Sequence, residues 1–258
     1  MSISPAVLEQ FRGVLVRTAG GYLRNPLRTD RVTCAVCTTP CPSYERCITC
    51  HRQLREPGQR ADQVAALTYV FANKQSGYVM RGYKAQPPVQ EHRDIVALTA
   101  ILGLGLHSGC AGKIVGNDIT HWAAVPSMPA KQVEHPLRRL VTQAAPGIEC
   151  NLQGAPTATN PRAISSEHFW MPPVPEGAHV LLIDDTWTSG GHAQSAVLAA
   201  RAAGAAHVSV LVVARWIEPS WALLLDGERK VDPETYLRGL SPGDYDPLVC
   251  PWTGGVCP

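Results

Sequence analysis

Two adjacent carboxylates stand just before a run of small polar residues. Asp184 and Asp185 are separated by two residues from Thr188 to Gly191, which read Thr-Ser-Gly-Gly. Small residues let successive backbone N–H groups point inward together, and hydroxyls add further donors, so this run favours phosphate binding. Two carboxylates so close repel each other unless a positive or hydroxyl-rich group lies opposite. A ribose diol with a magnesium ion would meet that need.

The flanking segments predict the elements that position this loop. Val180 to Ile183 is a continuous apolar run, typical of a strand buried on both faces of a parallel sheet. Ala193 to Ala203 predicts a helix that Gly204 ends, and His207 to Arg215 predicts the next strand. A phosphate would then lie at a helix N-terminus, where unpaired N–H groups and the helix dipole favour an anion. The structural alternative is an Asp that merely caps the helix and a Gly-Gly that merely turns the chain.

This segment resembles the signature of type I phosphoribosyltransferases. In that family an apolar strand leads into Asp-Asp, two variable residues, Thr, Thr or Ser, Gly-Gly and often Thr, a position that His192 occupies here. The resemblance implies that Asp184 and Asp185 hold the ribose hydroxyls, that Thr188 to His192 cradle the 5-phosphate, and that magnesium accompanies phosphoribosyl diphosphate. The implied phosphoribosyl-binding residues are Asp184, Asp185, Thr186, Trp187, Thr188, Ser189, Gly190, Gly191 and His192. Trp187 could stack on a base or pack beside the strand end, and the sequence leaves both open.

A second group of chemically active residues lies nearer the N-terminus. Two C-x-x-C pairs, Cys34 with Cys37 and Cys47 with Cys50, are separated by nine residues. Two such knuckles supply four thiolates for one tetrahedral zinc, which would replace the core that this short stretch lacks. An iron–sulfur cluster or a redox dithiol could use similar residues. Spare candidates are His51 and Cys41, and we interpret Cys41 as a bystander because the two knuckles already fill the site.

The order of a four-cysteine ribbon and a phosphoribosyltransferase-like domain resembles the ComF group, which is associated with competence and DNA uptake in bacteria. Tyr69 to Lys84 resembles that group's Tyr-x-Gly-rich lead-in ending in lysine, and Arg162 to Phe169 resembles the segment before the nucleotide strand. Ile119 to Val125 predicts a strand running into Pro126-Ser127-Met128-Pro129, where the family places its diphosphate-binding loop. Ser127 and Met128 are the implied diphosphate-binding residues. The family's Arg-Gly-Phe-Asn-Gln run is missing, and the chain offers these basic residues instead: Lys131, Arg138 and Arg139.

Composition restricts the class of protein. The 258 residues are 45% hydrophobic, as in a globular protein with a real core, and the net charge of +2 is far from that of a dedicated nucleic-acid binder. The longest apolar run, Ile95 to Leu106, is shorter than the roughly 20 residues of a membrane span. With no secretory signal apparent, we expect a cytoplasmic protein with reduced cysteines and no membrane partner.

The predicted fold is α/β and type I phosphoribosyltransferase-like, with a mainly parallel sheet flanked by helices and a small N-terminal zinc ribbon. Ser4-Pro5 and the apolar spacing that follows predict an amphipathic helix ending at Gly20-Gly21. The expected parts are an N-terminal helix in 1–30, the ribbon in 31–57, the phosphoribosyltransferase-like domain in 58–219 and a C-terminal tail in 220–258.

Four cysteines lie outside the ribbon. We interpret Cys110 and Cys150 as buried free thiols that behave as small apolar residues. Cys250 and Cys257 could pair, bind a metal or simply belong to a turn-rich tail, and nothing in the sequence chooses among these.

Two functions follow from this resemblance. One is magnesium-dependent transfer of a phosphoribosyl group to a nitrogen nucleophile with release of diphosphate. The other is a non-catalytic sensor or accessory protein that binds a ribose phosphate together with DNA or a protein partner. The chain could also form a homo-oligomer. The complete Asp-Asp loop favours the enzyme, and the missing arginine favours the accessory role.

Overall fold

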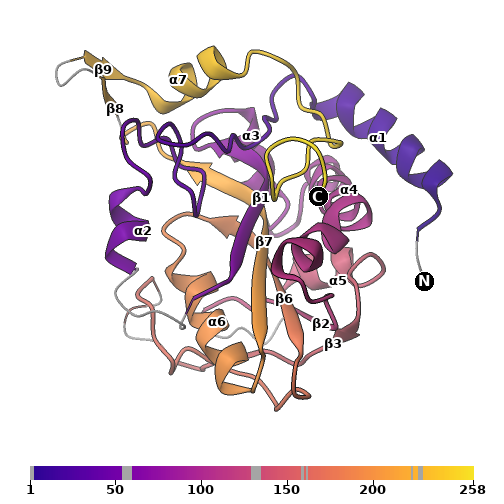
Figure 1. The fold of residues 1–258 in the computed structure, drawn as a ribbon. Helices are drawn as coiled ribbons and strands as arrows, with labels where there is room; N and C mark the ends of the chain where they lie inside the picture. Colours follow the sequence, from indigo (N-terminus) through magenta and orange to yellow (C-terminus); the bar gives the residue numbers. More distant parts are fainter. Residues whose placement is uncertain are drawn as a thin grey trace.

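A five-stranded parallel sheet forms the centre of the molecule (Figure 1). The computed structural model describes residues 3–53, 60–128, 135–157, 160, 162–221, 223–225 and 229–258. In spatial order the strands are β1 (Gln63–Phe71), β7 (His207–Ile217), β6 (His179–Trp187), β2 (His121–Ala124) and β3 (Ile148–Glu149). Every neighbouring pair is parallel, which confirms the predicted α/β class and the mainly parallel sheet.

Helices cover both faces of this sheet, because its strands are apolar on both sides. In β6, Val180 and Leu182 face one apolar cluster, while Leu181 and Ile183 face another on the opposite side. The first cluster is covered by α6 (Gly191–Ala202) and by the cysteine-rich segment with its short helix α2 (Ile48–Gln53). The second is covered by α3 (Gln75–Gly82), α4 (Gln90–Val115) and α5 (Pro136–Val141).

The predicted elements around the loop are present, with shifted ends. The strand expected at Val180 to Ile183 continues to Trp187, so the Asp pair lies within β6 and not beyond it. The helix begins at Gly191, two residues earlier than expected, and Gly204 follows it with a left-handed φ of 97°. Because the loop is therefore shorter than predicted, the carboxylates take their orientation from the strand.

The two ends of the chain pack on the same helix. The predicted N-terminal helix is confirmed as α1 (Pro5–Ala19), which packs against α4. Beyond the sheet lie β8 (Leu223–Leu225), β9 (Arg229–Val231) and α7 (Pro233–Leu240). The final segment then returns to α4, where Cys250 and Trp252 are buried in the second cluster. The remaining short strands are β4 (Gln153–Gly154) and β5 (Phe169–Trp170), which pair with each other.

Helix α4 is longer than the apolar run from Ile95 to Leu106 suggested. Its 26 residues have a best-window mean hydropathy of 1.7, so by length and composition alone it could cross a membrane. This is weak evidence for a span, because 56% of that window is buried within the fold, and a core helix passes the same test. Here α4 packs on β1 and β7.

Candidate phosphate and metal sites

The strand order places a crevice between β2 and β6. From β2 the chain proceeds through α5 to β3 at one edge, whereas from β6 it proceeds through α6 to β7 in the opposite direction. The two helices cover opposite faces of the sheet. In open α/β sheets, ligands bind outside the carboxyl ends of the strands at such a reversal. The topology thus indicates the carboxyl ends of β2 and β6 as the place where a ligand would bind.

The structure brings both predicted anion-binding segments to this reversal. The N–H of Val125 donates to the carbonyl of Ile183 at 2.8 Å, so β2 ends beside the Asp pair. Ser127 and Met128 follow directly and are half-buried. Pro129 and Lys131 lie outside the described residues. The predicted diphosphate-binding residues and the carboxylates therefore lie at one edge of the sheet.

Asp184 and Asp185 point to opposite faces of β6, since successive strand residues alternate. Asp185 turns toward α3 and α5, where it accepts a hydrogen bond from the Tyr83 hydroxyl and pairs with the Lys84 ammonium. The Nε2 of His135 lies 3.2 Å from the same carboxylate oxygen. Because the His135 Nδ1 accepts from the N–H of Leu137, its proton is on Nε2 and is donated to Asp185. This carboxylate is thus already partnered by protein groups.

Asp184 is equally buried and has weaker partners. Its Oδ1 accepts the backbone N–H of Asp185 at 2.8 Å, and the His192 Nδ1 lies 4.0 Å from its Oδ2. Burial and the neighbouring charge of Asp185 raise the pKa of Asp184 to about 7. Burial also acts on Asp185, but the Lys84 charge and the His135 hydrogen bond outweigh it and lower the pKa of that carboxyl. Near neutral pH the pair therefore carries between one and two negative charges.

The loop after β6 turns its carbonyls inward to the protein. The Arg215 guanidinium donates to the carbonyls of Trp187 at 2.7 Å and Thr188 at 3.0 Å, and the Gln53 amide donates to the carbonyl of Ser189 at 2.9 Å. Within the described chain, the N–H groups of Ser189 to His192 have no protein acceptor. These N–H groups are therefore unpaired donors, the kind of group that binds an anion at a helix N-terminus.

Gly190 and Trp187 together fix the shape of this loop. Gly190 has a φ of 82°, and a Cβ at this position would lie 2.1 Å from the Trp187 ring. Trp187 is only 2% exposed and packs in the cluster beneath α6 and the cysteine segment. Of the two open alternatives for Trp187, the structure supports packing beside the strand end. The Trp187 indole therefore packs against Gly190 and supports the loop.

His192, which stands where the resembled family often has Thr, is the second residue of α6. Its ring packs against Phe169 with 5.0 Å between centroids. Burial lowers the pKa of His192 to about 4, so the imidazole is neutral at physiological pH. A neutral ring can still donate one hydrogen bond to an oxygen of a ligand.

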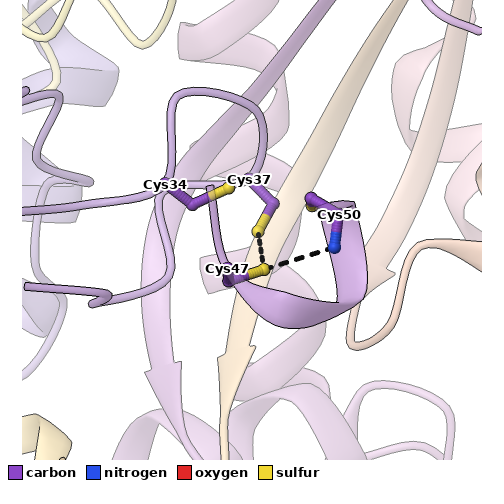
Figure 2. A group of neighbouring side chains, drawn as sticks. All are labelled: Cys34, Cys37, Cys47 and Cys50. Carbon is purple, nitrogen blue, oxygen red and sulfur yellow. Dashed lines mark hydrogen bonds between the residues drawn. The ribbon is translucent and has the colours of Figure 1, made fainter. Parts of the chain in front are cut away.

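The four predicted ribbon cysteines converge (Figure 2). The sulfurs of Cys34, Cys37, Cys47 and Cys50 all lie within 4.8 Å of one another, and those of Cys37 and Cys47 are 3.7 Å apart. Sulfurs bound at about 2.3 Å to one tetrahedral zinc would be roughly 3.8 Å apart, so the quartet could hold zinc. Hydrogen bonds from Cys37 and the other nearby thiols lower the pKa of Cys34. Cys41 and His51 are outside this quartet, as the interpretation of Cys41 as a bystander requires.

Arg215 connects the quartet to the loop after β6. The Arg215 Nε donates to the carbonyl of Cys37 at 2.9 Å, and the same side chain holds the loop carbonyls of Trp187 and Thr188. The hydroxyl of Tyr69, on β1, donates to the carbonyl of Thr38 at 2.6 Å. The first knuckle is therefore anchored to the sheet and to the loop by the same buried network.

Sequence reasoning missed several of these contacts. Tyr83 and His135 were not predicted at the site, and Lys84 was considered only as the end of the lead-in and as a lone basic residue that could neutralise diphosphate. Arg215, 3% exposed, was assigned only to a strand. The one sequence signal for these contacts was that Tyr83 and Lys84 end the segment from Tyr69 to Lys84 that resembles the ComF lead-in. Arg138 forms an ion pair with Glu149 on β3.

A second cluster has a different composition. The donor atoms of His107, Cys110, Cys250 and Cys257 lie within 4.8 Å of one another, so this group could also hold a metal. Cys110 is therefore placed among other ligand atoms, whereas the sequence suggested an isolated apolar thiol. Cys150 is half-buried beside the first apolar cluster.

Comparison of the chain with protein-family models, with curated proteins and with solved structures finds no match.

Proposed function

We propose that the chain binds phosphoribosyl diphosphate, or a related ribose phosphate, at the carboxyl ends of β2 and β6. The observation that carries this proposal is the set of unpaired N–H groups from Ser189 to His192, which open α6 beside a buried Asp pair. Helix N-termini with inward N–H groups favour phosphate, and carboxylates accept hydrogen bonds from sugar hydroxyls. The strand reversal supports the same place.

In this proposal each segment has a separate task. The loop from Thr188 to His192 holds the 5-phosphate, Asp184 and Asp185 hold the ribose hydroxyls, and Ser127 with Met128 faces the diphosphate. Carboxylate oxygens suit magnesium, so Asp184, the less occupied of the two, would hold that ion with the ligand's own oxygens, and magnesium would neutralise the leaving diphosphate. The proposal also includes transfer of the phosphoribosyl group to a nitrogen nucleophile, which implies a phosphoribosyltransferase fold.

Lys84 and His135 give Asp185 a specific role. Both keep its carboxylate ionised. The Lys84 ammonium supplies a positive charge, and the His135 Nε2–H donates a hydrogen bond to the same carboxylate oxygen. An ionised acceptor binds a ribose hydroxyl more strongly than a neutral one. We infer that Lys84, which is 41% exposed, turns from Asp185 toward the ligand's phosphates when the site fills.

Calorimetry with phosphoribosyl diphosphate and magnesium tests binding. The parent should release heat on titration, and the double variant Asp184→Asn plus Asp185→Asn should bind at least 10-fold more weakly, which corresponds to about 1.4 kcal/mol. Asp94→Asn is the matched control, since Asp94 is exposed on α4. Equal heats for the parent and the double variant would overturn the proposed site.

Turnover is tested separately. Release of diphosphate from phosphoribosyl diphosphate, measured across a panel of nitrogen bases and ammonia, should exceed release without nucleophile. Binding without release across the panel would contradict transferase activity while leaving the ligand site intact.

One observation favours the accessory role as a second candidate. A groove of about 670 Å³ lies beside the start of α6, and its lining includes Arg52, Arg60 and Arg162. Three arginines on one groove suit a polyanion such as DNA. Fluorescence anisotropy with labelled DNA should then give an affinity that falls steeply as salt rises. An affinity independent of salt would exclude DNA as the occupant.

A further inference from the structure

Two segments far apart in the sequence meet at the C-terminal end of α4. His107 and Cys110 lie three positions apart on one face of that helix, while Cys250 and Cys257 come from the final turns of the chain. Their imidazole nitrogen and three sulfurs all lie within 4.8 Å of one another. Residues three apart on a helix are neighbours on its surface, so the helical half of this group is preorganised.

The orientation of His107 points to a metal ligand. Its Nε2 lies 2.8 Å from the carbonyl of Pro247, and a carbonyl only accepts, so Nε2 carries the proton. The lone pair of Nδ1 is then free to face the sulfurs, and it lies 3.3 Å from the Cys257 sulfur. For a tetrahedral zinc this nitrogen–sulfur distance would be roughly 3.6 Å. Ligating histidines commonly donate their other ring N–H to a carbonyl in this way.

The C-terminal half is shaped by a closed turn. The N–H of Cys250 donates to the carbonyl of Gly255, and the N–H of Gly254 donates to the carbonyl of Cys250, both at 2.8 Å. Gly254 has a left-handed φ of 80°, which bends the chain back so that Cys257 reaches the cluster. The Trp252 indole donates to the carbonyl of His107 at 2.9 Å and fixes the turn on the helix.

We propose that His107, Cys110, Cys250 and Cys257 form a second zinc site that fastens the C-terminal segment to α4. Three thiolates and one imidazole are a structural zinc ligand set, and soft sulfur ligands disfavour magnesium or calcium. His107, Cys110 and Cys250 are at most 5% exposed, whereas Cys257 is exposed and leaves an entry path. A single disulfide would use only two of the three thiols and leave the Nδ1 of His107 without a function.

Such a site would stabilise a segment that has little regular structure. From Ser241 onward the described chain forms neither helix nor strand. It nevertheless contacts the N-terminal region, since the N–H of Tyr245 donates to the carbonyl of Gly20 and the Arg28 Nε donates to the carbonyl of Pro251. The zinc would therefore hold both ends of the chain on α4, as metal does in other segments too small for their own core.

Metal content of the purified, reduced full chain tests the proposal. With both clusters filled, the parent should contain two zinc ions per chain. Cys257→Ser and His107→Asn should each contain one, and Cys150→Ser, the control thiol outside both clusters, should keep two. A parent with a single zinc, or variants that keep two, would overturn the proposal.

Two further measurements remove ambiguity. His107→Asn alters a buried residue and could fail to fold, whereas Cys257 is exposed, so Cys257→Ser should fold. Replacement of zinc by cobalt should give a thiolate-to-cobalt charge-transfer band. In Cys257→Ser the intensity of this band should drop by about three sevenths, because loss of the second site removes three of the seven sulfur ligands. If the native mass of the parent is instead lower by two hydrogens and one zinc is bound, a disulfide occupies the cluster and the proposal fails.

Discussion

Asp184 and Asp185 differ in chemistry although they are neighbours on one strand. The alternation of β6 sends Asp185 to Lys84 and His135, and leaves Asp184 facing a neutral His192. One carboxylate is therefore held ionised, while the other titrates near neutral pH. Pairs of carboxylates whose pKa values are pushed apart are common at functional sites. The sequence alone suggested two equivalent acids.

The raised pKa of Asp184 predicts a pH-dependent stability. Its pKa is about 7 in the folded chain, against an ordinary value of 3.8, so the folded state favours the protonated form. This contribution is complete below pH ~4 and is lost as the pH rises through about 7. Relative to the parent, Asp184→Asn should therefore raise the unfolding temperature more at pH 8 than at pH 5, by roughly 4–8 °C for a difference on the order of 2 kcal/mol.

Thermal unfolding between pH 5 and pH 8 measures this difference. In that window Asp185, whose pKa is lowered, stays ionised and adds no slope. Asp94→Asn removes an exposed carboxylate and should leave the parent's profile unchanged. If Asp184→Asn keeps the parent's pH profile, Asp184 does not titrate in this range.

The strand, loop and helix from β6 to α6 form the element on which the proposed ligand binding depends. Arg215 and Gln53 hold the loop from the carbonyl side, and Trp187 supports it from below. These carbonyls have protein donors, whereas the N–H groups of Ser189 to His192 have no protein acceptor within the described chain. The loop is thus preorganised, and ligand binding would require little ordering of the chain.

Gly190→Ala tests this preorganisation. The left-handed φ of 82° disfavours any side chain, and the new Cβ would meet the Trp187 ring. We expect a loss of about 1–3 kcal/mol in the free energy of unfolding and a measurable loss of ribose 5-phosphate affinity. Gly239→Ala is the control, since a Cβ there meets nothing within 4 Å. Unchanged affinity in a folded Gly190→Ala chain would show that the loop conformation is not needed for the ligand.

The elements that sequence predicted correctly are local ones. The ribbon knuckles and the Asp-Asp loop each depend on residues close in sequence, so spacing was informative. Tyr83 contacts Asp185 across 102 positions, and His107 meets Cys257 across 150 positions. Such contacts depend on how helices pack on the sheet, which periodicity does not specify. The length of β6 was underestimated because Asp and Thr interrupt its apolar run, although the strand stays paired with β7 as far as Trp187 and both Asp side chains are buried.

In the chain as a whole, Arg215 joins three regions. From β7 it reaches the carbonyl of Cys37 in the ribbon and the carbonyls of Trp187 and Thr188 in the loop. Zinc with four thiolates would carry a net negative charge, and the guanidinium would lie near it. The ribbon is therefore a structural support of the proposed ligand site.

Arg215→Lys should weaken this support while keeping the charge. An ammonium has three donors and no planar fork, so several buried carbonyls would lose their partner. We expect a loss of about 3 kcal/mol in the free energy of unfolding, measured by denaturant titration, and weaker ribose 5-phosphate binding. Arg12→Lys, at a partly exposed ion pair on α1, is the control and should change neither. Parent-like stability in Arg215→Lys would remove the proposed link.

Removal of zinc from the ribbon also tests the link that Arg215 makes between the ribbon and the loop. A zinc-selective chelator should unfold the ribbon first, because thiolate ligation on the order of 10 kcal/mol replaces a core there. Since Cys37 and the loop share Arg215, ribose 5-phosphate affinity, measured without magnesium, should fall although no ligand-binding residue has changed. Of the two clusters that the described residues form, Cys257→Ser leaves the ribbon quartet intact, so the effect should persist in that variant and reverse when zinc is restored. If the fully demetallated chain keeps both its unfolding temperature and its affinity, the ribbon supports neither the fold nor the site.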